Sequence, residues 1–346
     1  MRPSTGSTEQ NMVAHLHTLP AQLAGRRVLV IGDVILDEYL IGNATRMSRE
    51  APIPVLEFRE RRHIPGGAAN PAANIAALGG DAVQIGVVGA DAAADHLKNA
   101  LAARGIRTAA LITDAARPTT LKMRVMAHMG LRFPQQVARM DTLSREPVPD
   151  AVAAQILVQV EAHIAGADAL LLSDYRAGML TPGLVARVRE IARARGILLT
   201  ADAQGNFDKY AGFALVKCNA AEAATALERP LHSDDDFATA ARTLYEQLSL
   251  TGGMVITRGG DGATLATADG AVHHCPAPSV TDVFDTVGAG DTAIAVMTLA
   301  LCAGATYPDA VTLANYASGL VVRRVGNYAP NADELRRALE TLTPLT

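Results

Sequence analysis

The sequence contains no tryptophan, and aromatic residues make up only 4% of its 346 residues, although 49% are hydrophobic. A buried core of this composition must therefore be aliphatic and rich in alanine. The three cysteines, Cys218, Cys275 and Cys302, are far apart and odd in number. They indicate neither a disulfide framework nor a zinc site, and this usage is typical of a reducing compartment. We therefore expect a cytoplasmic protein.

Long runs of a single residue class are also missing. No stretch of about 18 apolar residues occurs, and no apolar segment follows the polar residues 1–10, so we expect neither a membrane span nor a signal peptide. The net charge is −4 without a long basic run, which argues against nucleic acid or an anionic membrane as the main partner.

The sequence does contain a regular alternation of apolar strands and helices. Continuous apolar segments such as 27–33, 83–89 and 169–174 predict buried parallel strands with helices on both faces, which is an α/β fold. Two further pieces, about 37–65 and 119–141, are predicted to leave the main sheet and combine into a small β lid. We expect a tail and short helix over residues 1–24 and one domain over residues 25–346.

Polar side chains stand where the predicted strands end. Asp33, Asp174, Asp202 and Asn219 each close a strand, and the turn over residues 285–291 precedes a helix. In open α/β sheets, ligands bind beyond the carboxyl ends of the strands. One or two capping residues would be ordinary, but five polar ends predict a shared cleft.

The turn over residues 285–292 combines an anion site with an acid. Gly288, Ala289 and Gly290 free backbone N–H groups at the start of an apolar helix, where the helix dipole also favours negative charge. Asp291 puts a carboxylate beside this site, as phosphoryl transfer to a hydroxyl requires. An acidic first helical turn after a tight glycine entry would look the same, so the turn alone leaves both interpretations open.

Two motifs together make the chain resemble the ribokinase/PfkB sugar kinases. Residues 66–79 read Gly-Gly-Ala-Ala-Asn-(x3)-Asn-(x3)-Leu-Gly, and residues 285–291 supply the second signature in the right order. The resemblance covers about residues 27–340. It implies a ribokinase-like fold, ATP and Mg²⁺ as cofactors, and a sugar hydroxyl as acceptor, and it leaves K⁺ dependence open.

Within that family, several blocks resemble the kinases that phosphorylate D-glycero-D-manno-heptose 7-phosphate at O1 on the route to ADP-heptose. These blocks are residues 32–37, 46–55, 120–124, 139–141 and 173–175. Longer family members continue into a nucleotidyltransferase domain, for which this chain ends too soon, so we expect a separate nucleotidyltransferase partner. Family members also commonly dimerise through the unpaired edges of the lid, so we expect a homodimer.

Two departures from the family pattern leave alternatives open. Ala177 and Gln204 stand where the family usually has lysine. Arg176 could replace a missing cation, or the substrate could be another sugar, sugar phosphate or nucleoside. A non-catalytic sugar-phosphate sensor is a third alternative, and the intact turn with Asp291 argues against it.

The resemblance also implies roles for individual residues. Asp291 would be the general base, with the amides of Gly288, Ala289 and Gly290 as the anion hole. The implied substrate-binding residues are Asp33, Asp37, Gly66, Gly67, Asn70, Lys122, Arg124, Arg139 and Asp174. The implied nucleotide-binding residues are Asn219, Glu222, Thr257, Gly259, Gly262 and Asn315.

Several of these roles have simpler alternatives. Asn219 and Glu222 would organise Mg²⁺ through water, but the same pair could be an ordinary helix cap. The loop over residues 257–262 could be a plain hairpin turn. The cations in or beside the lid are candidates for binding a phosphate on the sugar, or they could simply be solvated. We call Arg46, Arg49, Lys122, Arg124 and Arg139 the lid cations.

Overall fold

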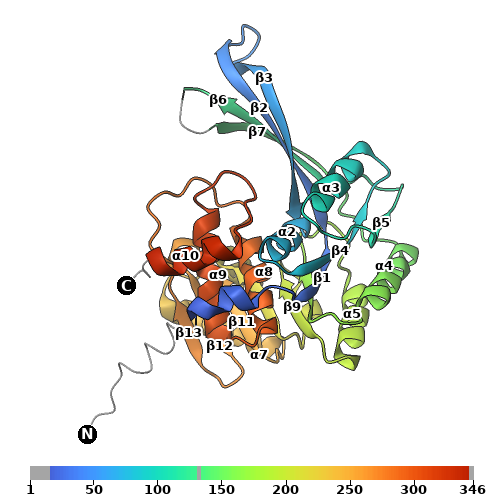
Figure 1. Ribbon diagram of the computed structural model, residues 1–346, viewed down its shortest axis with the longest axis vertical. Coiled ribbons are helices and arrows are strands. Elements are labelled where there is room, and N and C mark those ends of the chain that lie inside the picture. The colour runs from blue at the N-terminus through green and yellow to red at the C-terminus, as the bar shows by residue number, and fades with distance from the viewer. Residues whose placement is uncertain (1–15, 131–133, 343–346) are drawn as a thin grey trace.

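The computed structural model describes residues 16–130 and 134–342, so the expected tail over residues 1–10 lies outside the described residues. Its centre is a large sheet flanked by helices (Figure 1). The strands of this sheet are β1 (Arg27–Gly32), β4 (Asp81–Val88), β5 (Leu111–Thr113), β8 (Ala169–Ser173), β9 (Leu198–Asp202), β10 (Leu215–Asn219), β11 (Gly253–Thr257), β12 (Ala263–Thr267) and β13 (Val272–Cys275). Their order within the described chain is β13-β12-β11-β10-β9-β8-β1-β4-β5.

All strand pairs of the large sheet are parallel except the two at the β12–β13 edge. The parallel sheet predicted from the apolar segments is therefore confirmed. β5 was not predicted, because a three-residue strand is too short to show a periodic pattern.

Helices cover both faces of the sheet, as predicted. Side chains alternate along β1, so Val28 and Val30 join one hydrophobic core while Leu29 and Ile31 join the other. The first core is formed with α2 (Ala69–Ala77), α3 (Ala92–Ala102), α8 (Ala289–Cys302), α9 (Tyr307–Val321) and α10 (Ala332–Thr341). The second is formed with α4 (Asp150–His163), α5 (Pro182–Ala194), α6 (Ala220–Ala226) and α7 (Asp234–Gln247).

A smaller sheet stands away from the body and forms the predicted lid (Figure 1). Its strand order is β3-β2-β6-β7. The bounds are β2 (Val34–Met47), β3 (Pro54–Gly67), β6 (Leu121–His128) and β7 (Gln135–Thr142). β2 and β3 are 14 residues each and longer than expected, because their outer parts are exposed and carry no apolar pattern.

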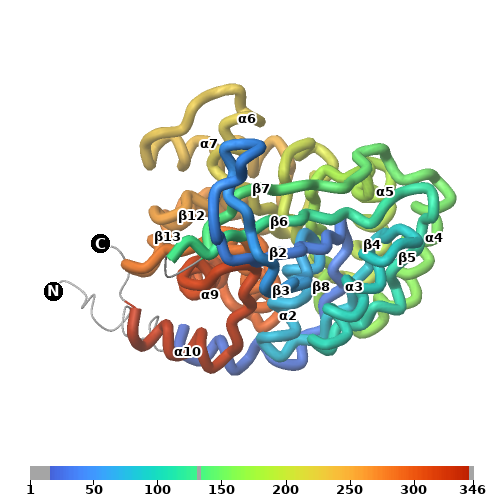
Figure 2. The backbone as a smooth tube through the Cα atoms, turned by 90° about the horizontal axis from the view of Figure 1, so that it is seen from above, coloured from blue at the N-terminus to red at the C-terminus, as the bar shows by residue number. Residues whose placement is uncertain are grey.

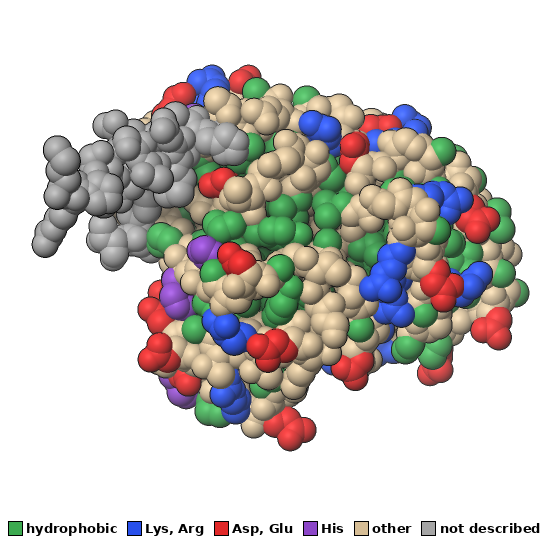
Figure 3. Space-filling model, turned by 90° about the horizontal axis from the view of Figure 1, so that it is seen from below, with side chains coloured by type: hydrophobic (Ala, Val, Ile, Leu, Met, Phe, Trp, Pro, Cys, Tyr) green, Lys and Arg blue, Asp and Glu red, His purple; other side chains and the backbone are tan. Residues whose placement is uncertain are grey.

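The lid lies over the functional end of the large sheet. β1 passes into β2 across a single residue, Asp33, so the carboxyl ends of the parallel strands face the lid. Seen from above, β6 and β7 cross over the body (Figure 2). The opposite face carries acidic and basic side chains interspersed around a band of hydrophobic ones (Figure 3).

The chain before the sheet also contributes to the core. Residues 16–22 are helical, and Leu19 and Leu23 are fully buried in the first hydrophobic core. Within residues 16–130 and 134–342, no helix has both the length and the apolar character needed to cross a bilayer.

Candidate active site

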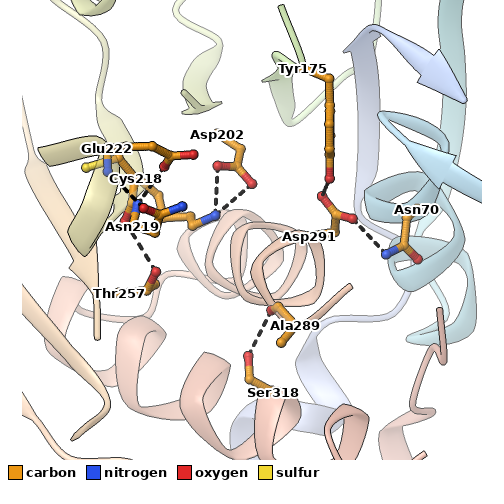
Figure 4. Close-up of polar contacts among 11 residues, drawn as sticks. Asn70, Tyr175, Asp202, Cys218, Asn219, Glu222, Thr257, Ala289, Asp291 and Ser318 are labelled. Carbon is orange, nitrogen blue, oxygen red and sulfur yellow. Dashed lines mark hydrogen bonds and ion pairs between the residues drawn. The ribbon is translucent and has the colours of Figure 1, made fainter. Parts of the chain in front are cut away.

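The carboxylate of Asp291 is the meeting point of three segments of the chain. It lies in the first turn of α8 and is only 5% exposed. The Tyr175 hydroxyl, from the loop after β8, donates to Oδ1 over 2.6 Å, and the Asn70 amide, from α2, donates to Oδ2 over 2.8 Å (Figure 4). Both carboxylate oxygens are thereby held in a fixed direction.

The surroundings of Asp291 change its acidity. Burial raises the pKa of Asp291, the charge of Asp202 raises it further, and the hydrogen bonds from Tyr175 and Asn70 lower it, with a net value of about 7. A carboxyl group with a pKa near neutrality is well matched to accepting a proton from a hydroxyl.

The glycines before Asp291 lie in close packing. Gly288 has a φ of +85°, and a Cβ there would lie 2.8 Å from both Asn70 Nδ2 and Asn327 Oδ1. A Cβ on Gly290 would lie 2.9 Å from Lys217 Nζ. The amides of the first helical turn have no intrahelical acceptor, although that of Ala289 donates to Thr286 O over 3.3 Å.

A second carboxylate, Asp37 on β2, lies at the base of the lid. It is 3% exposed and accepts hydrogen bonds from Arg124 and from Asn327, at 2.5 and 2.6 Å. A Cβ on Gly66 would lie 2.2 Å from Asp37 Oδ2, so this position also requires glycine. Arg124, which is also predicted to bind a phosphate on the sugar, pairs with Asp37, because a buried guanidinium needs a charged partner.

Asp33 and Asp174 bind the protein itself, whereas the sequence predicted that they contact the sugar. Asp33 accepts from the backbone N–H groups of Tyr175, Ala177 and Met179. Asp174 accepts from the side chains of Lys209 and Tyr210 and from a loop amide. Buried carboxylates require such donors, and here the backbone donors belong to the loop that carries Tyr175.

Three of the lid cations lie on neighbouring strands, with Lys122 and Arg124 on β6 and Arg139 opposite Arg124 on β7. The Lys122 ammonium lies 5.1 Å from the centre of the Tyr175 ring, beside the site. Arg139 is exposed and paired with Asp141 on the same strand, and Arg46 and Arg49 are exposed. A phosphate site formed by these lid cations therefore stays a prediction.

The predicted nucleotide-binding residues line two adjoining cavities beside α8. The first, about 440 Å³, is lined by Asn219, Glu222, Thr257 and Gly259, together with Asp291. The second, about 300 Å³, is lined by Thr257, Gly259, Gly262 and Asn315, among others. The Asn315 amide also donates to the carbonyls of Cys275 and Pro276, so it holds the wall of this second cavity.

Asn219 and Glu222 form a helix cap. The Asn219 side chain accepts from the Glu222 N–H, and the Glu222 carboxylate accepts from the Asn219 N–H, at the start of α6. Both still line the first cavity, across from Asp202 (Figure 4). No group of three His, Cys, Asp or Glu side chains among the described residues could hold a metal alone.

Sequence reasoning assigned no role to Tyr175, Lys217 or Asn327, although all three contact predicted site residues. Lys217 could have been noticed as a charged residue inside an apolar strand. Asn327 follows α9 in an irregular loop, where no local pattern marks its contact with Asp37.

The fold and this site define a phosphotransferase that acts on an alcohol group. The chain belongs to the pfkB family of carbohydrate kinases, whose sequence profile matches residues 26–334. The resemblance found in the two sequence motifs is thereby confirmed.

Curated relatives carry the name bifunctional protein HldE. The chain is 40% identical to that of Azorhizobium caulinodans, with 90% of this chain and 64% of the relative covered. It is 43% identical to that of Azotobacter vinelandii, with 90% and 63% covered. The chain thus spans slightly less than two thirds of the length of these relatives. Their bifunctional name does not support our expectation of a separate nucleotidyltransferase partner.

Solved structures show the same fold. Phosphofructokinase-2 from Escherichia coli in complex with substrates and products has a TM-score of 0.75 at 21% identity, covering 92% of this chain and 99% of the other. Ribokinase from Arabidopsis thaliana complexed with ribose and ATP has a TM-score of 0.71 at 17% identity, covering 91% and 99%. The predicted ribokinase-like fold is confirmed.

Proposed function

We propose that this protein uses ATP and Mg²⁺ to phosphorylate D-glycero-D-manno-heptose 7-phosphate at O1, giving heptose 1,7-bisphosphate for ADP-heptose synthesis in the cytoplasm. The observation that carries the phosphoryl-transfer step is the buried Asp291 carboxylate, held by Tyr175 and Asn70 beside the glycine turn. The choice of heptose rests on the sequence blocks described above and on the similarity to proteins named HldE.

The proposed step is an in-line displacement at the γ-phosphorus of ATP. As the sugar oxygen attacks, Asp291 takes its proton, and the bond between the γ-phosphorus and the oxygen that leaves with ADP breaks. First-turn amides of α8 stabilise charge on the phosphoryl oxygens. Mg²⁺ would neutralise phosphate charge, with Asn219 and Glu222 facing it through water. Lid closure would keep water from competing as the acceptor.

A basic cleft supports a substrate that itself carries a phosphate. The cleft, about 720 Å³, lies between the lid and the segment after α9. Its lining includes Arg59, Arg323 and Arg324, and also Arg62, which pairs with Glu60 of the same cleft over 2.6 Å. It also includes Gly326, whose neighbour Asn327 binds Asp37. A sugar phosphate with its sugar near Asp37 and Asp291 would place its phosphate toward these arginines, which suit phosphate recognition.

A kinase for another sugar, sugar phosphate or nucleoside is the second candidate. It is favoured by Ala177 and Gln204, the two positions where the family usually has lysine. A non-catalytic sensor is disfavoured, because a sensor has no use for a carboxylate poised to accept a proton.

The test is ADP formation from Mg-ATP with a panel of acceptors: the heptose 7-phosphate, the free heptose, fructose 6-phosphate, mannose 6-phosphate, ribose and adenosine. We expect the heptose 7-phosphate to give the highest kcat/KM, with the new phosphate at O1 by ³¹P NMR. Asp291→Asn should still bind ATP while turnover falls by roughly 10²- to 10⁴-fold. A better acceptor elsewhere in the panel would replace the heptose assignment, and full turnover by Asp291→Asn would refute the general base.

A further inference from the structure

Lys217 is a buried charge in an otherwise apolar strand, and neither sequence motif includes it. It is 5% exposed on β10, between the fully buried Val216 and Cys218. A lysine at such a position needs a partner to remain charged. The partner is Asp202 on the neighbouring strand β9, whose two carboxylate oxygens lie 2.7 and 2.8 Å from Lys217 Nζ.

The Lys217 ammonium faces the cavity where the phosphates of a nucleotide would lie. Lys217 and Asp202 both line the 440 Å³ cavity beside Asp291. A Cβ on Gly290 would lie 2.9 Å from Lys217 Nζ, so the ammonium sits against the glycine turn. An ammonium has three donors, and Asp202 accepts from it through two oxygens, which leaves a donor for a further acceptor.

Two other cations lie near this cavity, one paired elsewhere and one exposed. Arg258, the other cation among its described lining residues, pairs with Asp234 over 2.6 Å and stacks on Phe237 at 4.4 Å, both on α7. Arg176 is exposed, and its Nη1 approaches the backbone of Gly205, at 3.8 Å from an ideal Cβ there. Gln204 does line the cavity but carries no charge.

We propose that Lys217 donates a charge-assisted hydrogen bond to the γ-phosphoryl group of ATP and is the phosphate-binding cation of this kinase. It thereby supplies positive charge that Ala177 and Gln204 do not. Asp202 acts as a positioning residue, because its bidentate pair fixes the ammonium next to Gly290. Burial works against the charge of Lys217, but Asp202 more than offsets this and raises the pKa of Lys217, so the group stays protonated. The inference rests on the proposed kinase reaction but not on the identity of the sugar.

The test compares the binding of ATP, ADP and AMP by calorimetry, with Mg²⁺ and without any sugar, so that a wrong acceptor assignment does not affect it. The test variants are Lys217→Met and the double variant Lys217→Met/Asp202→Asn, which leaves no unpaired buried carboxylate. Lys209→Met is the matched control, since Lys209 also forms a buried pair, with Asp174 at 2.6 Å, outside this cavity. Arg176→Ala tests whether Arg176 binds the nucleotide phosphates in place of Lys217.

Both Lys217 variants should lower the affinity for ATP about 10- to 100-fold, as expected for the loss of one charge-assisted hydrogen bond. They should change the affinity for AMP by less than about twofold. Lys209→Met and Arg176→Ala should keep the wild-type ratio of ATP to AMP affinity. The proposal is overturned if the double variant keeps that ratio, because Lys217 would then serve only as the counter-ion of Asp202. It is also overturned if Arg176→Ala causes the loss of ATP affinity. If the single variant does not fold, the double variant decides.

Discussion

At the scale of single residues, the site works by controlling one carboxylate. Burial raises the pKa of Asp291, and the hydrogen bonds from Tyr175 and Asn70 lower it, so that the group titrates near neutrality. The orientation of Asn70 is itself fixed, because Asn74 donates to its side-chain oxygen and Thr292 donates to Asn74. The acid and its supports therefore form one connected network between α2 and α8.

This network predicts a pH dependence. With a pKa of about 7, Asp291 is ionised and active as a base above neutrality, so kcat/KM should fall about tenfold per pH unit below it. Tyr175→Phe removes a hydrogen bond that lowers this pKa, so the inflection should move to higher pH and the rate at pH 7 should drop several-fold. Full pH–rate profiles measure both effects.

The control for this prediction is Tyr210→Phe. Tyr210 also donates to a buried carboxylate, but to Asp174 over 2.7 Å. Its loss should leave the inflection in place. An inflection near pH 4 in the wild type, or an equal shift in both variants, would contradict the role of Asp291.

At the scale of elements, the site depends on how α8 begins. Gly288 has a φ of +85° and lies against Asn70, the same side chain that holds Asp291. The turn therefore couples its own backbone shape to the direction of the carboxylate. A residue larger than glycine at position 288 would displace the Asn70 side chain, even with Asp291 unchanged.

Gly288→Ala should therefore cost both stability and activity. The left-handed backbone alone costs about 1 kcal/mol for alanine, and the contact with Asn70 adds to this and lowers kcat by at least tenfold. Urea unfolding and steady-state kinetics measure the two effects.

Gly304, just after the same helix, provides the comparison for this prediction. It has a φ of +88°, and nothing lies within 4 Å of an added Cβ. Gly304→Ala should show the backbone cost without the loss of kcat. Equal kinetics in the two variants would mean that the packing of Gly288 on Asn70 has no bearing on catalysis.

At the scale of the whole molecule, the lid leaves apolar side chains in water. Phe58 on β3 is 69% exposed and Met140 on β7 is 64% exposed, and these are the two edge strands of the lid sheet. Unpaired edges with apolar side chains favour association. This supports the proposal that two copies pair through their lids.

Phe58→Asp combined with Met140→Asp should therefore convert a dimer into a monomer, because charge would replace apolar contact in the interface. Val158→Asp on α4 is the control, since Val158 is also exposed, at 61%, but lies on the body. Sedimentation measures the mass of each variant. A monomeric wild type, or a dimer that only Val158→Asp disrupts, would disprove pairing through the lid.

The sequence by itself determined the α/β class, the helices on both faces, the lid and the acid beside the glycine turn. These features depend on local patterns: continuous apolar strands, strand-to-turn punctuation and two short motifs. Only the tertiary structure decided that Tyr175 and Asn70 hold Asp291, that Asn327 and Arg124 hold Asp37, and that Lys217 pairs with Asp202. Each pair joins residues from different elements, so it depends on strand order and lid position. The tertiary structure also decided that Asp33 and Asp174 support a loop. Their buried carboxylates must accept hydrogen bonds, and the fold determines which donors are near them.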